Sequence, residues 1–167
     1  MRGRRLEGWD SVQRRGPEGE IESDERVTLS HPVVPWTEPG ARELGERYWQ
    51  EVRRASLGLV HVRALREGSE LRVRVVGTRL LRFGPVELAS EAQRVSCRFP
   101  IRGGVLARRA AGALVLSQSG ADGTSQLTAA LTGFVPRLGS RLYHHIQRRA
   151  HVAISRRYFR RLLEEHP

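Results

Sequence analysis

The chain has 167 residues, a length typical of one domain, and 39% of them are hydrophobic and 28% charged. Its single cysteine, Cys97, excludes an intramolecular disulfide and cysteine-rich zinc sites. The formal net charge is +11, and no run of about 18 apolar residues predicts a transmembrane helix. No signal-peptide pattern follows the basic start, so we expect a soluble, cytoplasmic protein.

The positive charge lies mainly in the second half of the chain. Residues 92–163 contain thirteen arginines and one acidic residue, Asp122, whereas residues 1–25 have a net charge of −2. Such a surface attracts phosphates, nucleic acid and acidic lipid headgroups in a salt-dependent way. The chain contains no lysine at all, so codon bias toward arginine is an alternative explanation of the excess.

The first predicted segments are a tail and a helix. Residues 1–34 mix charges with glycine and proline without a sustained hydrophobic period, which predicts a flexible charged tail. Residues 35–167 are expected to form a single domain. It opens with a helix over 39–56, capped by Thr37, whose apolar stripe comprises Ala41, Leu44, Tyr48, Val52 and Ala55.

Between residues 59 and 135 the apolar period changes to two, which predicts strands. The runs 59–65 and 71–76 flank one turn, and the runs 112–118 and 126–134 flank another. Further strands are predicted at 80–83, at 86–88 and around Val95, Cys97 and Phe99. The connections are too short for βαβ crossovers, so we expect an antiparallel sheet of about six or seven strands.

A long helix is predicted over 139–164. The apolar face of the sheet needs a cover, and this helix is the only element large enough to provide it. The predicted fold class is therefore α+β, with a curved antiparallel sheet gripping a long C-terminal helix.

The element order over residues 38–163 resembles the helix-grip fold of the START and polyketide-cyclase-like (SRPBCC) superfamily. The closing stretch is similar to the last helix of uncharacterised bacterial members, through Gln147-Arg148-Arg149 and Ile154-Ser155-Arg156-Arg157-Tyr158-Phe159-Arg160-Arg161-Leu162. The family pattern opens with a strand and two short helices. Here one helix is visible, and Val27-Thr28-Leu29 is the candidate strand.

The resemblance implies a sheet–helix cavity that holds a hydrophobic or amphipathic small molecule, and it carries over no catalytic residue. We expect a ligand-binding protein without cofactor or metal. The candidate lining residues are those predicted to point inward: Val73, Val75, Cys97, Phe99, Leu131, Ile146 and Ala150. The alternative is anion or nucleic-acid binding by the arginine-rich half, through Arg148, Arg149, Arg156 and Arg157. The sequence does not indicate an oligomeric state.

No catalytic constellation is visible in the sequence. Asp122 lies in a glycine-flanked turn, and Cys97 has the pattern of a small buried apolar residue. His144 and His151 are seven residues apart and lack the i,i+4 spacing of a helical metal pair. An enzyme that uses His61 or Tyr48 is a third reading, which no spacing favours.

Overall fold

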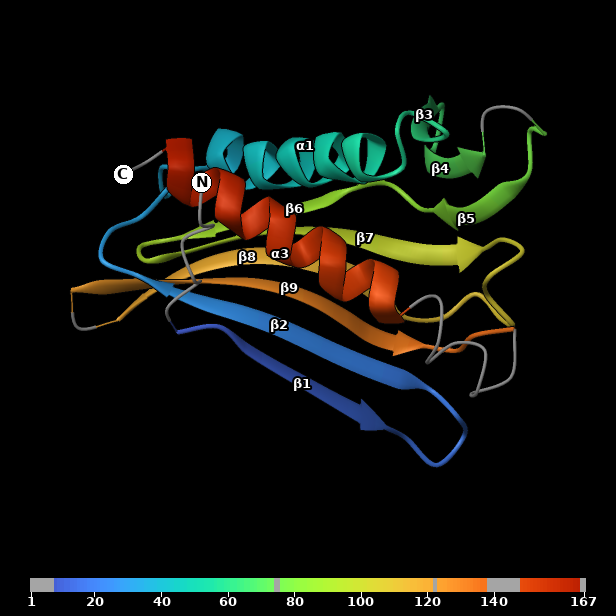
Figure 1. Ribbon diagram of the computed structural model, residues 1–167, viewed down its shortest axis with the longest axis horizontal. Coiled ribbons are helices and arrows are strands. Elements are labelled where there is room, and N and C mark those ends of the chain that lie inside the picture. Colours follow the sequence, from blue (N-terminus) through green and yellow to red (C-terminus); the bar gives the residue numbers. More distant parts are fainter. Residues whose placement is uncertain (1–7, 74–75, 122, 138–147, 166–167) are drawn as a thin grey trace.

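Figure 1 shows the computed structural model of the protein, which describes residues 8–73, 76–121, 123–137 and 148–165. Two helices lie on one face of an antiparallel sheet in this part of the chain, which gives an α+β fold. The elements in chain order are β1 (Asp10–Arg15), β2 (Ile21–Leu29), α1 (Glu38–Ala55), β3 (Val60–Leu65), β4 (Gly68–Val73), β5 (Arg79–Phe83), β6 (Glu87–Glu91), β7 (Arg94–Gly103), β8 (Ala113–Ala121), β9 (Thr124–Phe134) and α3 (Arg148–Glu165).

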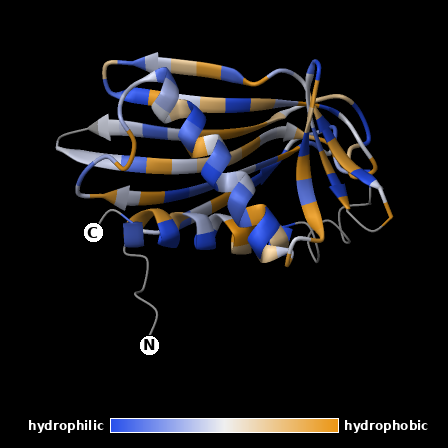
Figure 2. Cartoon of the chain, turned by 90° about the horizontal axis from the view of Figure 1, so that it is seen from above, coloured by the Kyte–Doolittle hydropathy of each residue, from blue (hydrophilic) through white to orange (hydrophobic). Residues whose placement is uncertain are grey.

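The sheet has the strand order β1-β2-β9-β8-β7-β5-β4-β3, and β6 also pairs with β7. Every pairing among the described strands is antiparallel, as predicted. The sheet has nine described strands, more than the six or seven expected, because the N-terminal segment contributes two. Figure 2 shows hydrophobic stretches on the short strands at one end of the sheet.

The expectation of a flexible tail over 1–34 requires correction. Residues 10–15 and 21–29 are strands, and β2 lies between β1 and β9, as the second strand from one edge of the sheet. The inward positions of β2 include the buried polar residues Ser23 and Glu25 between the apolar Ile21 and Val27. These two residues interrupt the apolar alternation that identifies a half-buried strand. The candidate strand Val27-Thr28-Leu29 is the end of β2.

Helix α1 begins as predicted and lies directly on β7. The Thr37 side chain accepts a hydrogen bond from the Gly40 amide at 3.3 Å, which caps the first turn. A Cβ on Gly45 would lie 2.7 Å from Cys97 Sγ and 2.9 Å from Phe99 Cζ, so only glycine permits this approach. Burial raises the pKa of the Cys97 thiol to about 12, and the thiol therefore packs as a neutral group.

Helix α3 confirms that the C-terminal helix covers the sheet. Its C-terminal half packs against α1 and the sheet through Ser155, Tyr158, Phe159 and Leu162, which are all buried. The Tyr158 hydroxyl donates to the Leu44 carbonyl of α1 at 3.2 Å. The first turn of α3 is exposed by contrast. The earlier part of the predicted helix, 139–147, lies outside the described residues.

Replacement of Leu57 by glycine is expected to stabilise the protein by about 1 kcal/mol. Leu57 follows α1 with a φ of 52° and is 90% exposed, so its side chain gains little packing while its Cβ strains the left-handed backbone. Chemical denaturation of Leu57→Gly measures the gain. Leu57→Ala is the matched control, since it removes the same exposed side chain and keeps the Cβ. An equal gain in both variants would show that backbone strain is not the cause.

Candidate ligand-binding site

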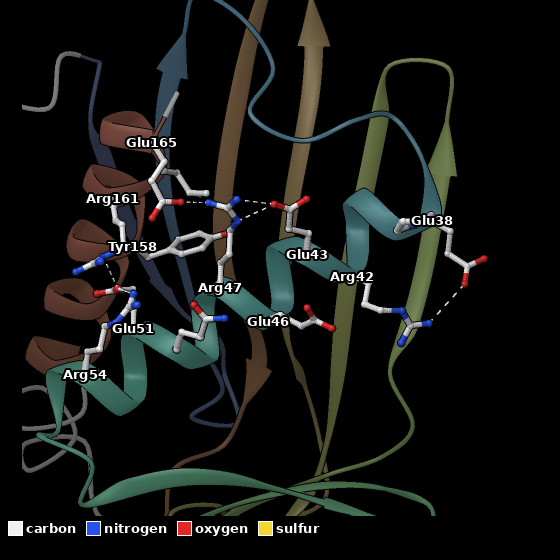
Figure 3. A pocket seen from close by; sticks show the side chains of 13 residues that line it. Glu38, Arg42, Glu43, Glu46, Arg47, Glu51, Arg54, Tyr158, Arg161 and Glu165 are labelled. Atoms are coloured by element: carbon white, nitrogen blue, oxygen red, sulfur yellow. Dashed lines mark hydrogen bonds and ion pairs between the residues drawn. The ribbon is translucent and has the colours of Figure 1, made fainter. Parts of the chain in front are cut away.

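One hollow among the described residues is a charged groove between α1 and α3, with a volume of about 730 Å³. Figure 3 shows charged side chains from both helices along it, with Tyr158 between them. The charged residues that line it are Glu38, Arg42, Glu43, Glu46, Arg47, Glu51, Arg54, Arg161 and Glu165.

The arginines of this groove are already paired. Arg47 contacts both Glu43 and Glu165, and so joins the two helices. Glu51 is only 2% exposed, and its Oε1 accepts a hydrogen bond from Arg54 and forms an ion pair with Arg161 of α3, each at 2.7 Å. Arg42 pairs with Glu38 at 3.7 Å. Each arginine that lines the groove therefore has a carboxylate partner, and the groove serves as a contact between helices.

The second hollow is an apolar cavity of about 430 Å³ between the C-terminal half of α1, the N-terminal half of α3 and the sheet. Arg157 is the only charged residue among the described residues that line it. The lining consists of Tyr48, Trp49, Val52, Ala55, Ser56, Val60, Leu71, Leu80, Leu81, Phe83, Ile101, Leu106, Leu114, Leu131, Phe134, Ala150, His151, Ala153, Ile154 and Arg157.

The position of the cavity follows from how the two helices are packed. Gly45 lets α1 rest on β7, and the buried side chains of α3 all come from residue 155 onward. The first turns of α3 therefore lie beside the C-terminal half of α1 without filling the space above the sheet. Ala150 and Ala153 are too small to fill it, which leaves an apolar hollow at this end of the molecule.

A polar pair joins the two helices at the cavity. The Tyr48 hydroxyl of α1 lies 3.2 Å from Nδ1 of His151 of α3, and both residues line the cavity. Burial raises the pKa of the Tyr48 phenol and lowers the pKa of His151 to about 4. Both groups are therefore neutral near pH 7, and the pair adds hydrogen-bonding capacity to the cavity without charge.

A buried carboxyl lies next to this pair, outside the cavity lining. Glu25 of β2 is 1% exposed, and its Oε1 accepts from the hydroxyls of Ser11 at 2.9 Å and Ser23 at 3.1 Å. Burial raises the pKa of this carboxyl, and its charge contributes to the raised pKa of Tyr48. The helix–sheet interface thus holds titratable groups from β2, α1 and α3 in an otherwise apolar environment.

The structure places the seven predicted lining residues in three groups. Leu131 and Ala150 line the cavity. Val73, Cys97 and Phe99 do not: Cys97 and Phe99 lie beneath α1 at Gly45, which covers that part of the sheet, and Val73 is half-buried at the end of β4. Val75 and Ile146 lie outside the described residues.

Sequence reasoning missed the aromatic and histidine part of the wall. Tyr48 belongs to the apolar stripe predicted for the first helix, and Trp49 adjoins it, so an aromatic pair on an amphipathic helix is the signal that the sequence offers. For His151, the sequence spacing speaks only against a helical metal pair. His61, the other candidate for chemistry, is half-buried on β3 and does not line the cavity.

The four candidate anion-binding arginines are exposed on different sides of α3. The Arg156 guanidinium lies over the Trp9 ring, 5.1 Å from its centroid, whereas Arg157 lines the cavity. Arg148 and Arg149 occupy the first turn. Anion or nucleic-acid binding through these residues stays a prediction.

None of the helices in the described residues has the length and apolar character required to cross a membrane. Within the same residues, no three histidine, cysteine, aspartate or glutamate side chains come together as a metal site.

No family model matches the chain, and no curated protein matches it either. Among solved structures, the chain is similar to Ms6760 from Mycobacterium smegmatis, with a TM-score of 0.44, 10% identity, and coverage of 95% of this chain and 100% of that chain. It is also similar to the crystal structure of CalU16 from Micromonospora echinospora, with a TM-score of 0.34, 12% identity, and coverage of 75% and 68%. The solution structure of CalU16 gives a TM-score of 0.35 with 13% identity over 77% and 64% of the two chains.

Proposed function

We propose that the protein binds a hydrophobic or amphipathic small molecule in the apolar cavity. The observation that carries this proposal is the cavity itself: about 430 Å³, bounded by two helices and the sheet and partly open to solvent, with one charged residue in its described lining. Ligand sites typically have volumes of roughly 300–1,000 Å³ and mainly apolar walls with a few polar groups. The neutral Tyr48–His151 pair supplies such polar groups.

We also propose that the chain is a member of the START and polyketide-cyclase-like superfamily. Support comes from the order of elements, in which β2 precedes α1, an antiparallel meander follows, and α3 closes the chain. The first strand of this series, β2, pairs with the last strand, β9, so α3 crosses back over the sheet. The extra edge strand β1 is a departure from the expected pattern.

Ala150→Trp is expected to weaken binding of an apolar probe at least tenfold. Ala150 is exposed on the first turn of α3 and lines the cavity, so an indole at this position can enter the cavity without displacing core residues. Equilibrium dialysis with 2-isopropylnaphthalene measures the dissociation constant of the wild type and the variant.

Arg149→Trp is the matched control for this experiment. Arg149 is exposed on the same turn and does not line the cavity, so the new indole should leave the affinity within twofold. Equal affinities of wild type and Ala150→Trp would place the probe elsewhere and refute the cavity as the site. Native mass spectrometry of the purified protein would add the mass of any ligand that is retained from the cell.

A further inference from the structure

Four exposed apolar side chains lie at one end of the sheet, and we call them the apolar rim. Among the described residues, five large apolar side chains are exposed. The four that form the apolar rim are between 47% and 90% exposed: Leu57, Leu59, Val76 and Val105. The fifth, Val86, lies between β5 and β6.

Strand pairing brings the four positions of the apolar rim to the same end of the molecule. The residue after Leu59 opens β3 and pairs with the last residue of β4, and Val76 lies in the link from β4 to β5. The Val105 amide donates to the carbonyl of Arg79, the first residue of β5, at 3.0 Å. Figure 1 shows the end of α1, the starts of β3 and β5 and the end of β7 at this end of the sheet.

The apolar rim adjoins the cavity, which is partly open to solvent. Three residues of the cavity lining are sequence neighbours of the rim: Ser56 precedes Leu57, Val60 follows Leu59, and Leu106 follows Val105. Exposed apolar patches of this kind on a protein surface mark sites that meet a partner.

The backbone at Leu57 indicates that the apolar rim makes a contact outside the folded chain. Leu57 has a φ of 52°, in the left-handed region that favours glycine, and its side chain is 90% exposed. Leucine here strains the backbone and gains little packing within the protein. A side chain that does not help folding is expected where its partner lies outside the chain.

Unpaired arginines accompany the apolar rim. Arg53 lines a shallow hollow together with Leu57, and Arg157 lines the cavity. Arg53, Arg157 and Arg149 are exposed, and none of the three forms an ion pair with a described carboxylate. Guanidinium groups next to exposed aliphatic side chains match anionic lipid headgroups above acyl chains. A nucleic acid would use the arginines but offers little apolar surface to leucine and valine, so the combination favours a bilayer.

We propose that the apolar rim and these arginines dock the protein on the surface of an anionic lipid bilayer. The aliphatic side chains enter the headgroup region, the guanidinium groups contact lipid phosphates, and the cavity then lies next to the bilayer. This inference goes beyond the proposed function, because docking needs only the surface. It also gives an apolar molecule dissolved in the bilayer a direct route to the cavity.

Cosedimentation with lipid vesicles tests the docking. One set of vesicles contains one part phosphatidylglycerol to two parts phosphatidylcholine, and the other contains phosphatidylcholine alone. The wild type should bind the phosphatidylglycerol vesicles at least about tenfold more tightly, because each arginine near an anionic surface contributes about fivefold. Added salt should weaken this binding.

Removal of the apolar rim should weaken vesicle binding although the arginines remain. The combined variant Leu57→Ser, Leu59→Ser, Val76→Ser should bind the phosphatidylglycerol vesicles about tenfold or more weakly, since its contacts with lipid chains are lost. Val86→Ser is the matched control, because it removes an exposed apolar side chain away from the rim. Its affinity should stay within about twofold of wild type.

Leu57→Gly separates docking from folding. This variant is expected to be more stable than the wild type, so damage to the fold cannot explain a loss of binding. It should nevertheless bind the phosphatidylglycerol vesicles about threefold or more weakly, because the exposed leucine side chain is gone.

The arginines are tested at constant net charge. Arg53→Gln with Arg149→Gln should weaken binding to the phosphatidylglycerol vesicles about tenfold or more. Arg94→Gln with Arg160→Gln is the matched control, because it removes the same charge at exposed positions at the start of β7 and in the C-terminal half of α3. The control should lose less than about threefold, since charges far from the bilayer are screened.

Each contrary outcome overturns the docking. If the wild type does not bind the phosphatidylglycerol vesicles, the inference is wrong, and binding to a DNA duplex instead would assign the arginines to nucleic acid. If the combined serine variant binds as the wild type does, charge alone attracts the protein and the apolar rim has no part in it. If Val86→Ser loses as much affinity as the combined variant, the contact surface lies elsewhere. The proposed function fails separately, when 2-isopropylnaphthalene does not bind in dialysis without vesicles.

Discussion

Replacement of Gln118 by leucine is expected to reduce the free energy of unfolding by about 3–5 kcal/mol. Gln118 of β8 is 0% exposed, and its side-chain amide holds the segment that leads into α1. Its Oε1 accepts from the Val33 amide at 2.7 Å and the Val34 amide at 3.1 Å, and its Nε2 donates to the Val34 carbonyl at 2.8 Å. Leucine has a similar size and leaves three buried backbone groups unsatisfied.

Urea denaturation of wild type and Gln118→Leu measures this loss. Gln126→Leu on β9 is the matched control, because Gln126 is half-buried and makes no side-chain hydrogen bond to a described residue. The control should change the stability by less than about 1 kcal/mol. A similarly small change in Gln118→Leu would mean that water replaces the amide and that the segment before α1 is held by apolar packing alone.

The second large effect is a pH dependence of stability that originates at His151. Burial lowers its pKa in the folded protein to about 4 from an ordinary value of 6.5. The unfolded chain therefore binds the proton more tightly, so the contribution is present above pH 6.5, declines as the pH falls, and is lost near pH 4. Between about pH 7 and pH 4.5 the loss amounts to roughly 2 kcal/mol.

His151→Phe should remove this part of the pH dependence. Urea denaturation at both pH values gives the loss of stability on acidification for each protein, and the variant should lose roughly 2 kcal/mol less than the wild type. The lost Tyr48 contact lowers the stability of the variant equally at both pH values, so it does not affect the loss on acidification. Glu25 titrates in both proteins, so its contribution cancels when the two losses are compared. The exposed His31, replaced by glutamine, is the control. Equal losses in wild type and His151→Phe would show that the folded protein binds the His151 proton as tightly as the unfolded chain does, so that burial does not lower this pKa.

The elements with a clear apolar period were predictable from the sequence. The stripe of α1, its Thr37 cap and the alternation around Cys97 all correspond to structure, because one face of each element is buried. Strand β2 was missed since Glu25 and Ser23 occupy inward positions, where their mutual hydrogen bond makes burial tolerable. The sequence pattern alone does not show that Glu25 has Ser23 as a hydrogen-bonding partner. Strand β1 was missed for another reason, since it is an exposed edge strand with no apolar alternation.

The candidate site was only partly predictable for a related reason. Inward-facing residues of the sheet were identified, but the sequence does not show which helix covers which part of the sheet. Gly45 decides this, because it brings α1 onto Cys97 and Phe99 and displaces the cavity toward Leu131 and Ala150. The position of the cavity thus depends on the absence of a side chain at Gly45, and the hydrophobic period of a helix does not reveal such an absence.

The uneven packing of α3 has a consequence for the range of molecules that the protein can accept. All fully buried side chains of this helix lie beyond residue 154, so most of its attachment comes from its C-terminal half, and the Tyr48–His151 hydrogen bond holds the turns above the cavity to α1. When that hydrogen bond breaks, those turns can tilt outward by a small angle while Phe159 and Leu162 keep their neighbours. A protein of this kind can accommodate ligands of different size with little loss of folding stability. Backbone amide hydrogen exchange along α3 should accordingly become slower toward its C-terminal half.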